Sequence, residues 1–340
     1  MKAISSETSA KVSLFAFLSA LAVCALHLPW PAQTPAERVF LTVLHSVLPT
    51  ALPLFFAISG FFLARRWQED GWWRRAVGKR ARTLLVPYFA WLAIFAAVMA
   101  AVAPDLSFFR GQTPMTWFGA FPWRPPRLYP LWFLRGLFLF VLMSPLVVKA
   151  VAAGRGLALL ASVYGAHLVY SSLMGVGFLN PNFSRLGGFL WYGFSLDGFV
   201  GFVLGVMLAI RPPLRRPSPR AVRLCGLAAA ALIALRVAAL LVLGWSHIVA
   251  PNVLIIPPLA VFLWYTVPAA KVTEVFKGSS FPIYLMHYAV IAVYGVLRGA
   301  AIGWLECLLL FALAVLVPVF TSRAVRRLSP RLSEFLFGGR

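Results

Sequence analysis

Long apolar segments separated by short, mostly basic loops run along the whole chain. A helix needs about 20 apolar residues to cross the hydrocarbon core of a bilayer. The pattern predicts ten such spans, at about residues 12–29, 40–63, 83–103, 129–148, 156–175, 193–210, 222–243, 251–269, 281–298 and 303–322. The expected fold is therefore an all-α, polytopic membrane protein. Residues 1–340 form one integral-membrane domain, with short tails at 1–11 and 323–340.

The distribution of positive charge predicts the orientation of these spans. Of the 31 lysines and arginines, 23 fall on the side of the chain that carries both tails and six fall on the other side. The remaining two, Arg135 and Arg236, lie inside predicted spans. Because positively charged residues concentrate in cytosolic loops, both termini are expected in the cytosol.

Composition supports a membrane protein and argues against other classes. Hydrophobic residues make up 61% of the chain and charged residues 12%, against roughly 25% charged in soluble domains. The net charge of +22 would suit a nucleic-acid partner, but the basic residues lie in short loops between spans. We therefore expect membrane lipid as the surroundings and no nucleic acid. The three cysteines lie in apolar segments without metal-ligand spacing, so no metal site is expected.

A few histidines lie within the predicted spans, where polar groups are costly and therefore informative. Histidine is the natural general base near neutral pH. His27 lies at the outer end of the first span and shares a helix face with Ser13 and Cys24. His45, near the outer end of the second span, could be interfacial. His287, in the ninth span, is expected to be structural or to line a substrate pocket.

Charged residues inside spans have two interpretations. Asp197 and Arg236 lie on neighbouring spans and could form a structural ion pair or line an acceptor pocket. Arg135 lies about 10 Å into the fourth span, at 1.5 Å per residue, and its side chain could extend outward to the interface.

The loop 64–82 carries seven cations. Lys79, Arg80 and Arg82 stand directly before the predicted start of a helix near Thr83. A helix N-terminus with adjacent cations binds anions, which suits the phosphates of coenzyme A. The alternative is that the charges serve only as an orientation signal.

Several motifs along the chain resemble membrane acyltransferase family 3, in the branch that modifies surface polysaccharides. They are PLFFAISG (53–60), KRAR (79–82), a Pro-Tyr pair (87–88), LWFL (131–134), SPL (144–146) and SFPIYLMH (280–287). His27 matches the histidine that ends the first span in this family. The resemblance covers nearly the whole chain.

The resemblance implies transfer of an acyl group, in the first place acetyl, from cytosolic acyl-CoA to a hydroxyl of an extracytoplasmic glycan or lipid-linked glycan. It implies a location in the bacterial cytoplasmic membrane, acyl-CoA as a substrate, and no permanently bound cofactor. His27 would be the catalytic base. The expected donor-binding residues are Lys79, Arg80, Arg82, Ser59 and Gly60. The expected pocket-lining residues are His45, Arg135, Trp132, Asp197, Arg236, Tyr284 and His287.

One position departs from the family pattern. Many members have an arginine eleven residues before the histidine, where this chain has Ala16. Lys11 lies on a different face of the helix from His27 and cannot simply replace that arginine. Either another cation, such as Arg135 or Arg236, serves the site, or acyl transfer is altered or lost. An inactive scaffold and a transporter or flippase for an anionic lipid or glycan are the alternative functions, although no internal repeat is visible.

Overall fold

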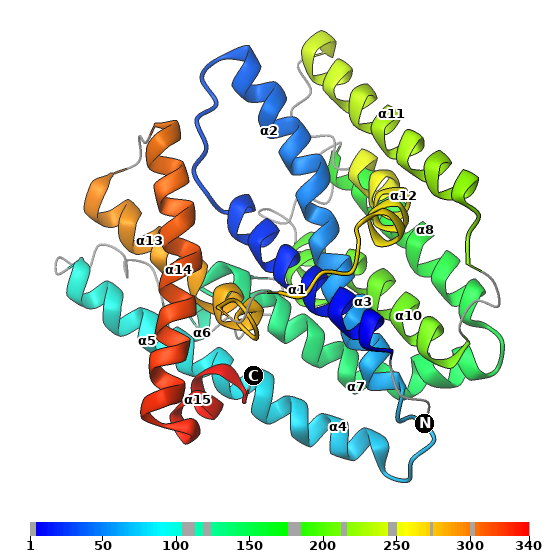
Figure 1. Ribbon diagram of the computed structural model, residues 1–340, viewed down its shortest axis with the longest axis horizontal. Coiled ribbons are helices and arrows are strands. Elements are labelled where there is room, and N and C mark those ends of the chain that lie inside the picture. Colours follow the sequence, from blue (N-terminus) through cyan, green and yellow to red (C-terminus); the bar gives the residue numbers. More distant parts are fainter. Residues whose placement is uncertain are drawn as a thin grey trace.

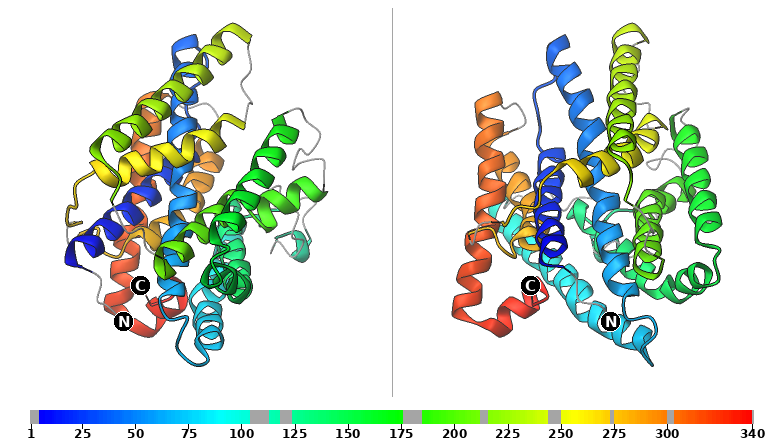
Figure 2. Two further views of the ribbon diagram at one scale, coloured as in Figure 1. Left: turned by 90° about the vertical axis from the view of Figure 1, so that its right-hand side faces the viewer. Right: turned by 45° about the vertical axis from the view of Figure 1, so that its right-hand side comes forward.

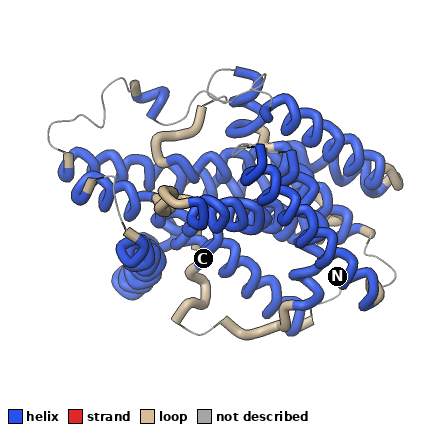
Figure 3. The backbone as a smooth tube through the Cα atoms, turned by 90° about the horizontal axis from the view of Figure 1, so that it is seen from above, coloured by secondary structure: helices blue, strands red, loops and turns tan. Residues whose placement is uncertain are grey.

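The computed structural model is a bundle of helices (Figure 1). It describes residues 5–103, 113–117, 124–175, 185–211, 216–243, 250–272, 275–299 and 303–339. Within these ranges every regular element is helical, as Figure 3 shows from above. The helices are α1 (Ser6–Leu26), α2 (Pro35–Val47), α3 (Ala51–Ala64), α4 (Trp72–Arg80), α5 (Val86–Val102), α6 (Pro114–Trp117), α7 (Trp132–Ala152), α8 (Gly156–Gly175), α9 (Arg185–Gly188), α10 (Leu196–Ile210), α11 (Pro219–Leu243), α12 (Ala250–Thr266), α13 (Ser280–Arg298), α14 (Trp304–Leu328) and α15 (Pro330–Phe337).

The described residues contain nine helical segments long and apolar enough to cross a membrane. They confirm a polytopic, all-α membrane protein. The predicted span at 251–269 is the exception, because the apolar part of α12 covers only Val253–Thr266. Proline at positions 257 and 258 lies inside this helix.

Two of the spans are longer than predicted because short helical turns join neighbouring helices. A 3₁₀ turn at Leu48–Thr50 joins α2 to α3. A π-helical turn at Ala81–Leu85 joins α4 to α5. The second joint corrects the predicted anion site: the helix begins at Trp72, so Lys79, Arg80 and Arg82 lie inside it and not in front of its N-terminus.

Helices α3 and α10 pack backbone against backbone near the centre of the bundle (Figure 1). Glycines make this approach possible, since a Cβ atom on Gly201 or Gly205 of α10 would overlap the carbonyl oxygens of Pro53 or Ala57 on α3. From the other side, a Cβ on Gly60 of α3 would overlap the carbonyl oxygen of Phe202. We call these contacts the glycine seam. Small residues of this kind are the usual means by which membrane helices approach closely.

The remaining helices surround the glycine seam. Helices α1 and α13 contact each other, and α1 also contacts α3; α7 contacts α10 and α4. Helices α11 and α12 pack together and against α2. The described ends of the chain lie at one end of the bundle, beside α4 (Figures 1 and 2).

The segment expected as a tail at 323–340 is helical and packed over its described part. Helix α14 continues to Leu328, and α15 follows after one residue. The indole Nε1 of Trp91 on α5 donates to the carbonyl of Leu336 at 2.9 Å, and Phe337 is fully buried. The C-terminal residues are therefore part of the bundle.

The glycine seam predicts a sharp difference between two Gly→Ala substitutions. Gly205→Ala forces α3 and α10 apart and should lower the free energy of unfolding by about 1–3 kcal/mol or more. Gly165→Ala, in α8, places its Cβ in open space and should be neutral or stabilising by up to about 1 kcal/mol through helix propensity. Thermal unfolding of both purified variants in one detergent checks this. Equal melting temperatures for the two would contradict the role given to the seam.

Candidate active site

The C-terminal end of α1 places His27 beside a small internal cavity. The helix ends at Leu26, and His27 is its half-buried cap residue. Its ring Nδ1 lies 2.7 Å from the carbonyl oxygen of Val23, one turn earlier. The cavity measures about 200 Å³. It is lined by Val23, Leu26, His27, Pro49, Leu52, Tyr129, Pro130, Trp132, Phe133, Trp191, Asp197 and Tyr284.

This His27 cavity brings together four of the residues singled out in the sequence. His27 comes from α1, Trp132 from the start of α7, Asp197 from the start of α10 and Tyr284 from α13. The Tyr284 hydroxyl donates to the carbonyl of Pro130, just before α7. A histidine, a carboxylate and two indoles, of Trp132 and Trp191, therefore share one space of small-molecule dimensions.

His287 lies against His27 on the side of α13. It is fully buried, and its Nε2 is 3.4 Å from Nδ1 of His27. The rings of Tyr129 and Tyr288 also contact the His27 ring, edge to face, at 5.8 and 5.6 Å between centroids. Both histidines were predicted to be functional or structural, but their contact was not predicted, because no motif links two residues 260 positions apart on different spans.

Asp197 is held by a strained turn at the start of α10. Ser195, the residue before that helix, is fully buried and has a φ of 53°, the left-handed region that a non-glycine residue rarely adopts. Its hydroxyl donates to Oδ1 of Asp197 at 2.7 Å. A carboxylate in the first turn of a helix is also favoured by the helix dipole. Strain of this kind clusters at functional sites.

The predicted ion pair between Asp197 and Arg236 is wrong. Arg236, on α11, donates from Nη1 to the carbonyl of His45 at 3.0 Å and to the hydroxyl of Ser46 at 2.7 Å. These contacts join α11 to α2, away from the His27 cavity. Neither His45 nor Arg236 lines that cavity.

Arg135 supports the wall of the His27 cavity from behind. Its Nη2 donates to the carbonyls of Arg124 at 3.0 Å and Tyr192 at 2.9 Å, and so ties α7 to the segment before α10. Lys11 lies over the ring of Trp264, 5.5 Å from its centroid. Among the described contacts of His27, none involves either of these cations or Arg236.

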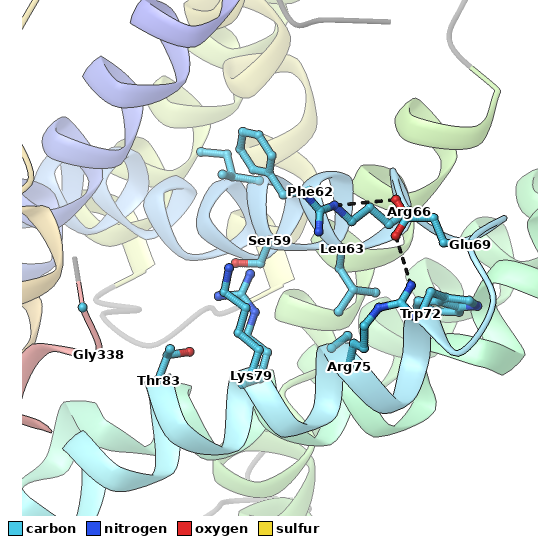
Figure 4. A pocket seen from close by; sticks show the side chains of 14 residues that line it. Ser59, Phe62, Leu63, Arg66, Glu69, Trp72, Arg75, Lys79, Thr83 and Gly338 are labelled. Carbon is cyan, nitrogen blue, oxygen red and sulfur yellow. Dashed lines mark hydrogen bonds and ion pairs between the residues drawn. The ribbon is translucent and has the colours of Figure 1, made fainter. Parts of the chain in front are cut away.

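A second, larger cavity lies between the end of α3 and helix α4 (Figure 4). It measures about 690 Å³. The lining residues are Ile58, Ser59, Phe62, Leu63, Arg66, Glu69, Trp72, Arg75, Ala76, Lys79, Arg80, Thr83, Gly338 and Gly339. We call it the basic cavity, because its cations outnumber its single carboxylate.

Three of the five predicted donor-binding residues line the basic cavity: Ser59, Lys79 and Arg80. The Lys79 side chain extends from α4 toward Ser59 on α3 (Figure 4). The other two do not line it. Arg82 is exposed and faces elsewhere, and Gly60 is buried in the glycine seam.

Glu69 lies between two cations at the edge of the basic cavity. Its carboxylate is 3.1 Å from Nη2 of Arg75 and 3.8 Å from Nε of Arg66 (Figure 4). All three side chains are about half exposed or more, so these ion pairs contribute little to stability. They leave the cations available to an incoming anion.

The two cavities lie along one helix. Leu52 of α3 lines the His27 cavity and Ser59 of the same helix lines the basic cavity. These residues are two turns apart, or about 10 Å. The rings of Phe55, Phe133 and Tyr284 pack between the two levels, with centroids 5.9 Å and 5.2 Å apart in that order.

The fold and these cavities define a multi-pass membrane protein with a histidine lining one cavity and cations around another. A family model described as an acyltransferase domain matches residues 14–323. The chain belongs to this family, acyltransferase family 3. This confirms the family that the motifs indicated.

Among curated proteins, the chain is similar to the succinoglycan biosynthesis protein ExoH of Rhizobium meliloti (strain 1021). The two are 30% identical over 177 residues, which is 46% of this chain and 46% of that protein. The chain thus matches about half the length of this curated relative. No solved structure matches the chain.

Arg135 and Arg236 provide a matched pair for testing the wall of the His27 cavity. Arg135→Met removes donors from two carbonyls and should cost about 1–3 kcal/mol of stability for each group left unsatisfied. It should also lower the turnover of acyl transfer. Without these hydrogen bonds the start of α7 is free to move, and Trp132, which lines the His27 cavity, moves with it. Arg236→Met should lower stability but keep turnover per folded molecule. Melting temperature and kcat measured together check this; unchanged kcat in Arg135→Met would contradict it.

Proposed function

We propose that this protein transfers an acyl group, in the first place acetyl, from cytosolic acyl-CoA to a hydroxyl of an extracytoplasmic glycan or lipid-linked glycan, in the bacterial cytoplasmic membrane. The observation that carries this proposal is the arrangement of the two cavities along α3. Cations surround one, and the candidate base, His27, lines the other.

The basic cavity suits the nucleotide part of the donor. Its cations come from two places: Arg66 lies after α3, and Arg75, Lys79 and Arg80 lie on α4. Phosphate groups pair well with such guanidinium and ammonium groups. Ser59 adds a hydroxyl at the inner wall. The acyl end of the donor reaches the His27 cavity along α3 once the packed rings of Phe55, Phe133 and Tyr284 move apart.

The His27 cavity suits the acceptor hydroxyl and the thioester. The indoles of Trp132 and Trp191 offer flat apolar faces for a sugar ring, and the Asp197 carboxylate accepts hydrogen bonds from sugar hydroxyls. The similarity to a succinoglycan biosynthesis protein supports a polysaccharide acceptor. The sugar class is thus the acceptor best supported.

The tautomer of His27 follows from its contact with Val23. A backbone carbonyl only accepts hydrogen bonds, so Nδ1 of His27 carries a hydrogen. In the neutral ring, Nε2 then has the free lone pair and is the atom that acts as the base. This assignment comes from the heavy-atom geometry.

The reaction balances with His27 as a proton carrier. Nε2 takes the proton from the acceptor hydroxyl while its oxygen attacks the thioester carbonyl. The carbon–sulfur bond then breaks, and the leaving thiolate takes the proton back from the imidazolium. The products are the acylated sugar and free coenzyme A, and His27 returns to its neutral state.

Lys79 and Arg82 separate donor binding from orientation. Both are cations within a few residues of each other, but only Lys79 lines the basic cavity. Lys79→Ala should raise the apparent KM for acetyl-CoA several-fold and leave kcat nearly unchanged. Arg82→Ala should leave both constants unchanged, although it removes the same charge from the same side of the membrane. If the two variants change the KM for acetyl-CoA equally, the cations serve only to orient the protein in the membrane.

Replacing His27 tests the proposed base directly. General-base removal costs about 10²–10⁴-fold in rate, so His27→Ala should lower kcat by that factor while acetyl-CoA binding is retained. His45→Ala, a histidine outside both cavities, is the control and should keep its activity. Normal acylation by His27→Ala would refute the proposed mechanism. A wild-type protein that transfers nothing in the presence of acceptor would instead support an inactive family member.

A further inference from the structure

The hydrogen-bond partners of His287 determine which of its ring nitrogens can interact with His27. Nδ1 of His287 lies 3.0 Å from the carbonyl of Ile283 and 2.8 Å from that of Tyr284. Both partners only accept hydrogen bonds, so Nδ1 carries a hydrogen. The Nε2 atom of the neutral ring is therefore an acceptor. It is this atom that lies 3.4 Å from Nδ1 of His27.

The two rings meet as a donor and an acceptor. Nδ1–H of His27 points to the Val23 carbonyl at 2.7 Å and has Nε2 of His287 as a second acceptor within reach. The ring centroids are 5.2 Å apart. His287 is itself held by two hydrogen bonds on a helix where it is fully buried. It is thus a fixed group against which His27 is oriented.

We infer that His287 is a positioning residue for His27. Resting on the proposed function, this assigns His287 two effects. It keeps His27 in the tautomer whose Nε2 is free to act as a base, and it shares the positive charge that His27 gains when it takes the acceptor proton. No bond to substrate is involved, and the proton leaves again with the thiolate.

A neutral imidazole suits this role in a membrane. The carboxylate that orients the histidine of a serine protease triad would place a permanent charge at this buried position, which is costly. The His27–His287 pair is neutral at rest and carries one positive charge only while the proton is held. Among the described residues, the phenol rings of Tyr129, Tyr284 and Tyr288 lie around the pair, and Asp197 lines the same cavity. Asp197 can balance that charge.

Two substitutions at position 287 separate the acceptor atom from the bulk of the ring. His287→Phe keeps a ring of similar size but has no acceptor. His287→Gln can place its Oε1 where Nε2 was and accept from Nδ1–H of His27. The matched control is His45→Gln, which makes the same change at a histidine outside both cavities.

The experiment uses the full-length protein in lipid nanodiscs, acetyl-CoA as donor, and chemically deacylated surface polysaccharide of the source cells as acceptor. We expect His287→Phe to lower kcat by about 10–100-fold, by analogy with the loss that follows when the hydrogen-bond partner of a metal-ligating histidine is removed. We expect His287→Gln to keep most of the wild-type kcat. Its KM for acetyl-CoA and its melting temperature should also be near those of the wild type.

Three results would overturn the inference. If His287→Phe is as active as wild type while His27→Ala is inactive, the base is correct and His287 does not position it. If His287→Gln is folded and as inactive as His287→Phe, the acceptor atom is not what matters. If His27→Ala is itself fully active, the proposed base fails, and the role of His287 fails with it.

Discussion

The close contact between α3 and α10 is the constraint on which the site depends. Backbone carbonyls of α3 occupy the space that side chains on Gly201 and Gly205 would fill. In a bilayer, helices gain little from leaving lipid, so close packing of this kind is a main source of helix association. The contact brings Asp197, at the start of α10, beside Leu52 of α3 in the His27 cavity. It also fixes the position of Ser59 along the bundle axis relative to that cavity.

Helix α3 then relates the two cavities to each other. It is continuous with α2 over 30 residues and is therefore a rigid element. The distance between Leu52 and Ser59 along this helix sets the distance between the two cavities that they line. The basic cavity takes its other wall from α4 and from Gly338 and Gly339 near the C-terminus. A Cβ on Gly338 would lie 2.6 Å from the carbonyl oxygen of Thr83, so the chain passes very close to the π-helical turn between α4 and α5. The C-terminal end of the described chain thus helps to shape the basic cavity.

Much of the fold was accessible from the sequence because a bilayer imposes a strong pattern. Apolar segments of sufficient length located nearly all the spans, and the motifs identified the family. His27, Trp132 and Tyr284 were found because they lie in those motifs, and Asp197 because a carboxylate in a span is rare. The helix through the basic segment was missed, since Arg80 and Arg82 interrupt the apolar pattern but not the backbone hydrogen bonding.

Contacts between distant spans were not accessible in this way. Arg236 was paired with Asp197 on the basis of charge, but the backbone of His45 and the hydroxyl of Ser46 satisfy it on another face of the bundle. Gly60 was placed at the donor because of its motif, although its close neighbour is the backbone of α10. The approach of His287 to His27 depends on the tilt and depth of α1 and α13. Hydropathy identifies such helices but does not determine their relative depth in the membrane.

The central claim is that donor and acceptor reach one site from opposite sides of the membrane. The most direct test uses proteoliposomes in which a tag in the turn between α3 and α4 reports which face is outside. Acetyl-CoA is supplied only on the face that carries the tag, and deacylated polysaccharide is enclosed on the other face. The account predicts acetylated polysaccharide in that compartment and almost none when the two substrates are exchanged. Product formed only when both substrates share one face would contradict it.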